Sequence, residues 1–249
     1  MTNVINYEEL AQLQKRYPRG VGNDYMLPAE ARALAERGKL FCAADECALF
    51  IFERRWGYTK LRFRLRDASA QLPQIDSDTG PLGAYLVYRA GGPPGAAAGW
   101  LAGQGFTRAV TLERYTARRL TGQPCAEGTE AASPGEAYAM LGKYFAAPDM
   151  DMPCPDMFEG ALCVRGGRGE PLGVLYAGRD GVVVAVSPEA RNKGAGRGLY
   201  LAYAAGKLNE NENAVFHEWI RPENAASIAM FKKLGFARDG AVTDCYVRG

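Results

Sequence analysis

Apolar positions along the second half of the chain change spacing repeatedly, which predicts strands and helices in alternation. Near-continuous or alternating apolar runs predict strands at 158–164, 172–177, 182–186, 214–220 and 241–248. Apolar residues at helical spacing predict helices at 136–145, 199–208 and 225–234. Glycine-rich turns such as 166–169 separate these elements. The predicted order is one helix, three strands, a helix, a strand, a helix and a last strand.

The first half of the chain predicts a similar order. Helices are expected at 7–17 and 28–37, three strands at 39–43, 47–54 and 59–66, a further strand at 82–89, and a last strand at 109–118. Residues 94–106 align without a gap with residues 224–236, so that Gly105-Phe106 falls on Gly235-Phe236. This is a repeat at domain scale. We expect one domain at 1–120, a linker rich in turn residues at 121–133, and a second domain at 134–249.

A glycine-rich segment between the strand at 182–186 and the following helix has the properties of an anion-binding loop. Glycines stand at positions 194, 196 and 198, where a backbone without side chains lets a ligand approach closely. The first N–H groups of a helix lack intrahelical partners and lie at the positive end of its dipole. Three basic side chains add charge to this segment: Arg191, Lys193 and Arg197. The segment is therefore expected to bind a phosphate group.

Two familiar phosphate loops do not fit this segment. A Walker loop needs Gly-Lys followed by Ser or Thr, and the dinucleotide fingerprint needs a third glycine where Leu199 stands. The pattern Arg191-x-x-Gly194-x-Gly196 instead resembles the acyl-coenzyme A loop of the GNAT acetyltransferase superfamily. The plainer alternative is a glycine-rich turn before an ordinary helix.

A second segment strengthens the resemblance. The residues from Asn224 through Phe231 to Gly235-Phe236 are similar to the other GNAT signature, and they follow the glycine loop at the spacing of that family. The resemblance covers roughly residues 130–249. It implies an α/β (α+β) fold of tandem GNAT-like domains, each with a mixed, mostly antiparallel central sheet flanked by helices.

The first half lacks the glycine loop. Residues 67–80, between two predicted strands, contain no glycine cradle and leave no room for the pyrophosphate-binding helix. The N-terminal half is therefore expected to be a degenerate GNAT-like domain without a cofactor site, which makes one coenzyme A per chain. An unrelated α+β domain with a chance Gly-Phe match is the alternative.

The resemblance implies an acyl-coenzyme A-dependent N-acyltransferase, most simply one that moves acetyl from acetyl-CoA to a primary amine of a small molecule, amino acid or peptide. Backbone amides of the strand before the loop, around Ala185 and Val186, would stabilise the developing oxyanion. The implied cofactor-binding residues are Ala185, Val186, Arg191, Asn192, Lys193, Gly194, Ala195, Gly196, Arg197, Gly198, Asn224 and Phe231.

Phe231 departs from the family pattern, because a tyrosine often stands there and protonates the leaving thiolate. A phenylalanine cannot donate a proton, so another hydroxyl, solvent, or a domain that only binds must be considered. Tyr246 on the last strand and Tyr200 on the loop helix are the candidate hydroxyls, and Tyr246 is the preferred one.

The general base is sought on the strand at 214–220. Glu218 and His217 interrupt its apolar run on opposite sides, and a partly desolvated carboxylate has a pKa raised toward a useful range. Glu218 is the first candidate, with an ion pair to Arg221 or to a loop lysine as its structural alternative. His217 and Asp180 are further candidates.

Composition limits the other classes of function. A formal net charge of +2 argues against a general nucleic-acid binder, and no apolar stretch approaches a membrane span. Six cysteines without a Cys-x-x-Cys pair, and a single histidine, make a metal site improbable and suit the cytoplasm. A catalytically silent coenzyme A-binding sensor and a purely structural module remain as alternatives to the enzyme.

Overall fold

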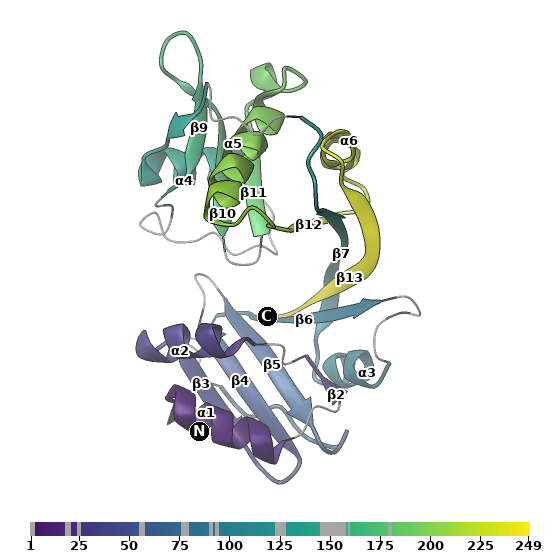
Figure 1. Cartoon of the computed structure of the whole chain (residues 1–249). Coiled ribbons are helices and arrows are strands. Elements are labelled where there is room, and N and C mark those ends of the chain that lie inside the picture. Colours follow the sequence, from purple (N-terminus) through teal and green to yellow (C-terminus); the bar gives the residue numbers. More distant parts are fainter. Residues whose placement is uncertain are drawn as a thin grey trace. The chain divides into compact units, whose positions relative to one another are not determined.

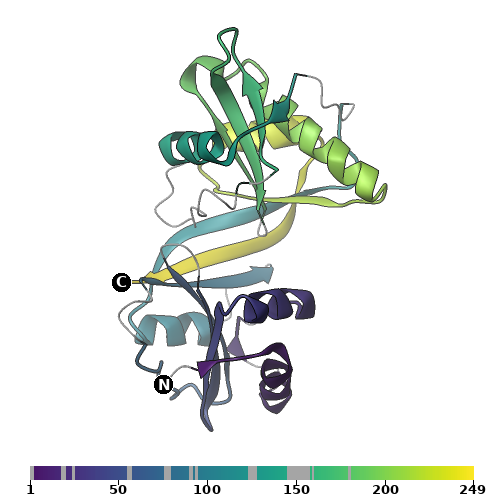
Figure 2. The same cartoon turned by 90° about the vertical axis from the view of Figure 1, so that its left-hand side faces the viewer.

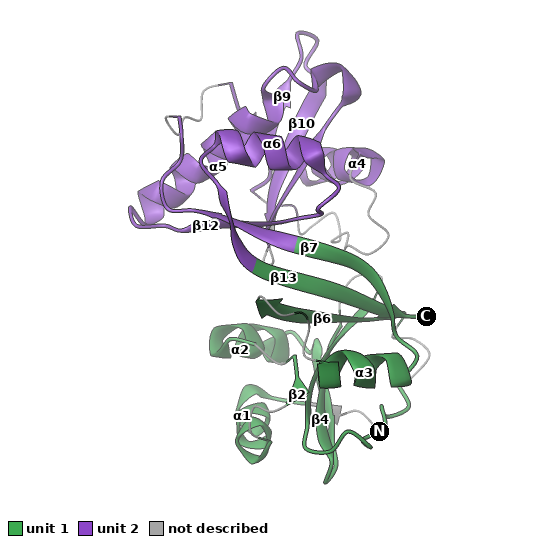
Figure 3. Ribbon diagram, turned by 90° about the vertical axis from the view of Figure 1, so that its right-hand side faces the viewer, with its two compact units in different colours: residues 1–112, 241–249 green, residues 113–240 purple. Residues whose placement is uncertain are grey.

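A computed structural model describes residues 3–17, 21–23, 26–54, 58–75, 80–89, 92, 95–122, 128–144, 158, 160–178 and 181–249 (Figure 1). The chain forms two compact units (Figure 3). Unit 1 comprises Met1–Leu112 together with Ala241–Gly249, and unit 2 comprises Glu113–Gly240.

Unit 1 is built on an antiparallel sheet with one parallel junction. Its strands are β1 (Asn3–Val4), β2 (Val21–Gly22), β3 (Leu40–Ala44), β4 (Ala48–Arg54), β5 (Thr59–Leu65), β6 (Leu82–Arg89) and parts of β7 (Thr107–Ala117) and β13 (Ala237–Arg248). Its helices are α1 (Tyr7–Arg16), α2 (Pro28–Glu36) and α3 (Gly95–Gly103). The strands follow the order β1-β3-β4-β5-β6-β13, and only β5 and β6 run parallel.

Helices cover both faces of this sheet. Figure 2 shows α1 and α2 on one face and α3 on the other. Because side chains alternate across a strand, β4 contributes Leu49 and Ile51 to the core under α1 and α2, and Phe50 to the core under α3. Trp100 of α3 stacks on Phe50 at a centroid distance of 5.7 Å. Strand β4 is thus buried on both sides, which explains its continuous apolar sequence.

Strands β5 and β6 separate after a short parallel contact. They pair only from Thr59–Leu82 to Leu61–Ala84. Beyond this point β2 pairs with β5, with Val21 opposite Leu65. The edge of β5 that β6 leaves is therefore covered by another segment of unit 1.

Asn23 completes that cover. Its backbone N–H donates to the Phe63 carbonyl at 3.1 Å, and its side-chain oxygen accepts from the Phe63 N–H at 2.7 Å. Its amide nitrogen donates to the carbonyls of Leu61 at 3.0 Å and Tyr85 at 3.2 Å. The neighbouring Gly22 lies so close that a Cβ there would collide with the Phe63 carbonyl. Residues 21–23 thus bridge the diverging strands β5 and β6.

Unit 2 contains a four-stranded antiparallel sheet and a second strand pair. The sheet consists of β8 (Glu130–Ala131), β9 (Leu162–Arg165), β10 (Pro171–Gly178) and β11 (Gly181–Val186), in the order β11-β10-β9-β8. The other pair is β12 (Phe216–Ile220) with residues 113–117 of β7. The helices are α4 (Pro134–Tyr144), α5 (Ala195–Glu210) and α6 (Ala225–Lys233), with a 3₁₀ turn at Pro188–Ala190.

The faces of the unit 2 sheet bury different helices. Val174 and Ala185 pack with α4, whereas Leu175 packs with α5 and α6. In Figure 2 α4 and α5 lie on opposite sides of strands β9–β11. Tyr200 of α5 is the largest fully buried side chain of the chain's described part. Its ring meets Phe231 and Phe236 edge-to-face at 5.0 and 5.7 Å.

Strands β7 and β13 each belong to both units (Figure 3). Residues 113–117 of β7 pair with β12 in unit 2, and residues 241–248 of β13 pair with β6 in unit 1. The strand that follows the last helix of each half therefore pairs with the other half's sequence. For this reason the compact units differ from the predicted division into 1–120, 121–133 and 134–249, which treats each half as a continuous stretch.

The predicted fold class is confirmed, since each unit contains a mostly antiparallel sheet flanked by helices, with the parallel β5–β6 pair in the sheet of unit 1. Most boundaries lie within a few residues of the prediction. The strand at 158–164 is shorter, beginning at Leu162, and the helix at 199–208 is longer, beginning at Ala195. The short strands β1, β2 and β8 were not expected, because two residues carry no detectable periodicity.

Candidate functional site

The glycine loop of unit 2 forms an uncapped helix N-terminus. Gly194 is the N-cap of α5 in the left-handed conformation (φ 89°), and no side chain caps the helix. Asn192 is also left-handed (φ 63°), a conformation that Asn tolerates better than most residues. The Gly198 N–H makes an intrahelical bond to the Gly194 carbonyl at 2.9 Å. The N–H groups of residues 195–197 precede this bond and are the orphan donors expected at a helix start.

Basic side chains surround this helix start. Arg191, Lys193 and Arg197 are exposed. The Arg191 Nε donates to the Val186 carbonyl at 3.3 Å, which ties the loop to the end of β11. The donors, the helix dipole and the positive charges together favour an anion such as a pyrophosphate.

Gly196 has a packing role as well. A Cβ at this position would contact Met230 Sδ at 3.3 Å and Val186 Cγ2 at 3.5 Å. Glycine thus lets α5 approach both β11 and α6 closely. At Gly198, by contrast, a Cβ would meet open space.

The strand before the loop has an open backbone edge. Strand β11 is the end strand of its sheet, and the Val182 N–H donates to Glu218 at 3.2 Å instead of to β10. Because backbone groups alternate along an antiparallel strand, those of Val184 and Val186 also point away from β10. The Ser187 N–H, one residue on, donates to the β10 side at Leu172 (2.8 Å). Ala185 therefore directs its backbone toward β10, so the open-edge donors near the loop are Val184 and Val186.

The second signature forms helix α6. Asn224 is its N-cap, and the Asn224 side-chain oxygen accepts from the Ser227 N–H at 3.1 Å. Phe231 is only 6% exposed and packs against Tyr200 and Phe236. The signature thus accounts for the start of the helix and for an aromatic cluster beneath the loop helix.

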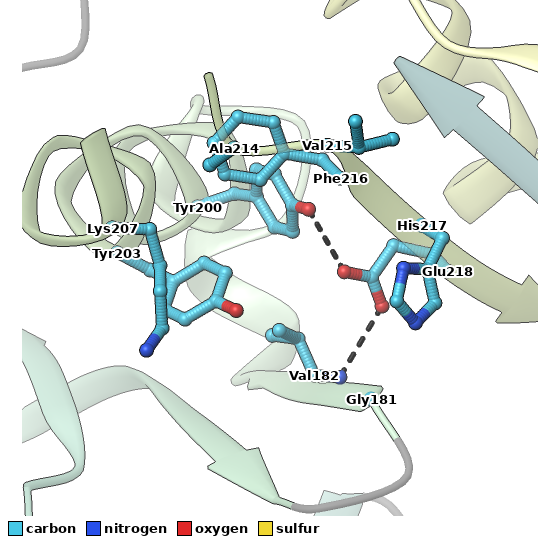
Figure 4. A pocket seen from close by; sticks show the side chains of 10 residues that line it. All are labelled: Gly181, Val182, Tyr200, Tyr203, Lys207, Ala214, Val215, Phe216, His217 and Glu218. Carbon is cyan, nitrogen blue, oxygen red and sulfur yellow. Dashed lines mark hydrogen bonds between the residues drawn. The ribbon is translucent and has the colours of Figure 1, made fainter. Parts of the chain in front are cut away.

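Glu218 lies beside a small cavity between α5, β11 and β12 (Figure 4). The cavity has a volume of about 140 Å³. Glu218 is 4% exposed, and its Oε1 accepts a hydrogen bond from the Tyr200 hydroxyl at 2.8 Å. Its Oε2 accepts from the Val182 N–H. The residues that line the cavity are Gly181, Val182, Tyr200, Tyr203, Lys207, Ala214, Val215, Phe216, His217 and Glu218.

Burial changes the acidity of the groups in this cavity. It raises the pKa of Glu218 from 4.5 to about 7, and the hydrogen bonds from Tyr200 and Val182 oppose this rise in part. Burial, followed by the nearby Glu218 charge, raises the pKa of the Tyr200 hydroxyl, which therefore stays protonated. A carboxyl group with a pKa near 7 can take up and release a proton at neutral pH.

The other predicted catalytic residue lies elsewhere. Tyr246 belongs to unit 1, is 7% exposed and packs in the core beneath α3 with Trp100 and Leu86. Burial and the neighbouring Asp244 raise the pKa of its hydroxyl. The structure therefore does not bring Tyr246 and Glu218 together within one unit. Asp180 lies outside the described residues.

Strand β12 is buried on one face only. Phe216, Glu218 and Ile220 are buried, whereas His217 is exposed. Glu218 and His217 therefore lie on opposite faces of β12, Glu218 on the buried face and His217 on the exposed one. The residue that sequence reasoning undervalued is Tyr200, whose hydroxyl reaches Glu218. The sequence places Tyr200 on the helix after the glycine loop, but a tyrosine at a core position does not reveal its hydrogen-bond partner.

The described residues contain no group of three or more His, Cys, Asp or Glu side chains that could hold a metal ion. In the same part of the chain, no helix combines the length and the apolar character needed to cross a membrane.

Part of the chain is similar to a known protein family. Residues 173–247, from β10 to β13, match the family of FR47-like proteins. This stretch contains the open edge of β11, the glycine loop, Glu218 and α6. No curated protein sequence matches the chain significantly.

Several solved structures resemble most or nearly all of the chain. A Drosophila protein aligns with a TM-score of 0.64 at 15% identity, over 98% of this chain and 97% of its own. A tandem GNAT protein from the clavulanic acid biosynthesis pathway aligns at 0.52 and 12% identity, over 97% and 87%. A GCN5-related N-acetyltransferase from Kribbella flavida aligns at 0.52 and 17% identity, over 83% and 88%. The resemblance predicted from the two signatures is therefore confirmed, and the chain has the fold of the GNAT superfamily.

Proposed function

We propose that the protein is an acyl-CoA-dependent N-acyltransferase that moves an acetyl group to a primary amine of a small molecule, an amino acid or a peptide. The observation that carries this proposal is the continuity of an open strand edge with an uncapped helix start. Val184 and Val186 direct their backbone N–H groups away from β10, and the loop at 191–198 follows after the 3₁₀ turn Pro188–Ala190. An extended ligand with amide groups at one end and phosphates at the other suits this sequence of donors.

Different residues of the loop and of β11 suit different parts of an acyl-CoA molecule. The N–H groups at the start of α5 and the basic side chains Lys193 and Arg197 would hold the pyrophosphate. The edge of β11 would bind the pantetheine amides, and a backbone N–H there would stabilise the oxyanion. Acyl-CoA supplies an activated thioester carbonyl. Asn224 and Phe231 contribute through the position of α6 rather than through an exposed polar group.

Glu218 is the proposed general base. An amine is a cation in water and must lose a proton before its nitrogen can attack the thioester carbon. The Glu218 carboxylate would take that proton before the attack. The neutral amine would then form the C–N bond, the C–S bond would break, and the second proton lost by the nitrogen would pass to the departing thiolate or to solvent. The buried position of Glu218 and its pKa of about 7 support this role.

One observation favours a second candidate, a coenzyme A-binding sensor without catalysis. Phe231 occupies the position where a tyrosine would protonate the thiolate, and its ring offers no proton. In the sensor the loop would bind acetyl-CoA, but no thiol would be released.

The test combines binding with turnover. Titration calorimetry should detect acetyl-CoA binding, and a thiol reagent should detect CoA release with at least one amine from a panel of small amines, amino acids and peptides. Binding without thiol release across the panel would favour the sensor. Absence of acetyl-CoA binding would contradict both candidates.

A loop variant assigns the binding site. The double variant Lys193→Glu with Arg197→Glu should raise the dissociation constant for acetyl-CoA about 10- to 100-fold, because charge-assisted hydrogen bonds contribute about 1.5–3 kcal/mol. The matched control, Lys15→Glu with Arg37→Glu, makes the same change in net charge at exposed positions of unit 1. Equal losses of affinity in the two variants would indicate a general charge effect and contradict the loop assignment.

A further inference from the structure

Phe231 and Tyr200 form an aromatic pair in which only Tyr200 carries a hydroxyl. The two rings meet at a centroid distance of 5.0 Å and an interplanar angle of 88°. Phe231 carries no hydroxyl, whereas the hydroxyl of Tyr200 extends past this contact to Glu218. The polar function of this aromatic cluster therefore lies on α5, the helix that begins at the glycine loop.

Tyr200 has little freedom to move. Its side chain is fully buried, and its ring also makes edge contacts with Tyr203 and Phe216, at 5.6 and 6.4 Å. A side chain packed on several sides keeps one rotamer, so its hydroxyl is held at a fixed place. In Figure 4 this hydroxyl points directly at the Glu218 carboxyl group.

Glu218 connects three elements. It stands on β12, accepts one hydrogen bond from α5 and accepts another from the backbone of β11. Each carboxyl oxygen thus has one donor, and each keeps a further lone pair for a ligand. The two donors come from different elements, so together they fix the orientation of the carboxyl plane.

The charged and titratable neighbours of Glu218 in the described residues are few. Tyr200, Tyr203 and Lys207 face the cavity from α5, and His217 lines it from β12. Tyr115 of β7 is the cross-strand neighbour of Glu218. Lys207 donates to Glu210 at 2.9 Å, which partly compensates its charge. Tyr200 is the neighbour that donates directly to the carboxylate.

We infer that Tyr200 is a positioning residue of the acyl-transfer site, whose hydroxyl orients the Glu218 carboxyl group and stabilises its ionised form. This inference rests on the proposed function of Glu218 as the base. It also connects the cofactor loop with the base through one rigid helix, since Tyr200 and Gly194 are separated by less than two turns of α5.

The sign of the effect follows from the hydrogen bond. The Tyr200 hydroxyl donates a hydrogen bond to the ionised carboxylate and so lowers the pKa of Glu218, whereas burial raises it. Removal of the hydroxyl therefore raises the pKa of Glu218. A hydrogen bond to a charged group corresponds to a shift of about 1–2 pH units. In Tyr200→Phe the acidic limb of the kcat/KM profile should move upward by this amount, and activity at pH 7 should fall about tenfold.

The experiment measures the pKa of Glu218 by two methods. Carbon-13 NMR follows the titration of the glutamate carboxyl carbons in the full chain, and the Glu218 signal is assigned by its loss in Glu218→Gln. The pH profile of acetyl transfer is recorded in parallel. Tyr203→Phe is the control, because it removes a hydroxyl from the same helix and cavity without breaking the bond to Glu218. The thermal melting of each variant establishes that it is folded.

The outcomes separate the two claims. An upward shift of both the NMR midpoint and the kinetic limb in Tyr200→Phe, but not in Tyr203→Phe, supports the inference. A folded Tyr200→Phe variant with an unmoved Glu218 midpoint overturns it. If the midpoint moves while the wild-type chain transfers acetyl to no amine, the hold of Tyr200 on Glu218 stands and the proposed enzymatic function fails.

Discussion

Strand β5 of unit 1 is the third strand after helix α2, and strand β11 of unit 2 is the third strand after helix α4. The free edges of these two strands differ. The edge that β5 presents beyond Leu61 is covered by residues 21–23, with Asn23 bonded to both backbone groups of Phe63. In the described part of the chain no strand pairs with the outer edge of β11, although β12 lies near it. The Val182 N–H on this edge donates to the Glu218 side chain, and the N–H groups of Val184 and Val186 point to the same side.

This difference shows how one arrangement can be closed or left open for a ligand. Backbone N–H and C=O groups away from water need partners. In unit 1 the chain supplies the partners itself, and the described residues between β5 and β6 form no helix with a glycine start. In unit 2 the open edge is followed, after a 3₁₀ turn and the glycine loop, by the uncapped start of α5. We therefore expect unit 2 to bind the cofactor and unit 1 to have a structural role.

The largest expected effect concerns the chemistry at the open edge. Glu218→Gln should lower turnover by about 10²–10⁴, the usual contribution of a general base. The affinity for acetyl-CoA should change little, because Glu218 lies apart from the basic loop. Steady-state kinetics and calorimetry on the same preparation measure both quantities. Normal turnover per folded molecule would assign Glu218 a purely structural role.

A smaller effect is expected at the closed edge. Asn23→Ala should lower the free energy of unfolding by about 2–4 kcal/mol, because it leaves the buried Phe63 N–H and Leu61 carbonyl without their partners. Urea denaturation measures this change. Asn209→Ala, at an exposed position of α5, is the control and should change stability by less than about 0.5 kcal/mol. Equal stability of both variants would mean that residues 21–23 do not hold β5 and β6 together.

Much of the fold could be predicted because it depends on local patterns. The apolar runs at 82–89 and 182–186 and the glycine spacing at 194–198 specify strands and a helix start without reference to distant residues. The exchange of β7 and β13 between the compact units could not be read this way, because periodicity reports the conformation of a strand and not its partner. The segment at 21–23 is too short to show a period at all.

The residues of the candidate site could likewise be predicted where a local pattern marks them, and not where they depend on distant partners. The loop at 191–198 is a continuous stretch, so its residues were found together. Glu218 was found because a carboxylate in an apolar strand is unusual. Tyr246 was chosen by chain position alone, and it lies in the core of unit 1. Tyr200 was undervalued because its hydrogen bond to Glu218 joins residues 18 positions apart through the packing of α5 on the sheet.

The most direct test of the comparison is the stoichiometry of acetyl-CoA binding to the full chain. Calorimetry should give one equivalent per chain, and the double variant Lys193→Glu with Arg197→Glu should weaken that single site. Two equivalents per chain, or one equivalent whose affinity is unchanged in the loop variant, would contradict the account that unit 1 is closed and unit 2 is open.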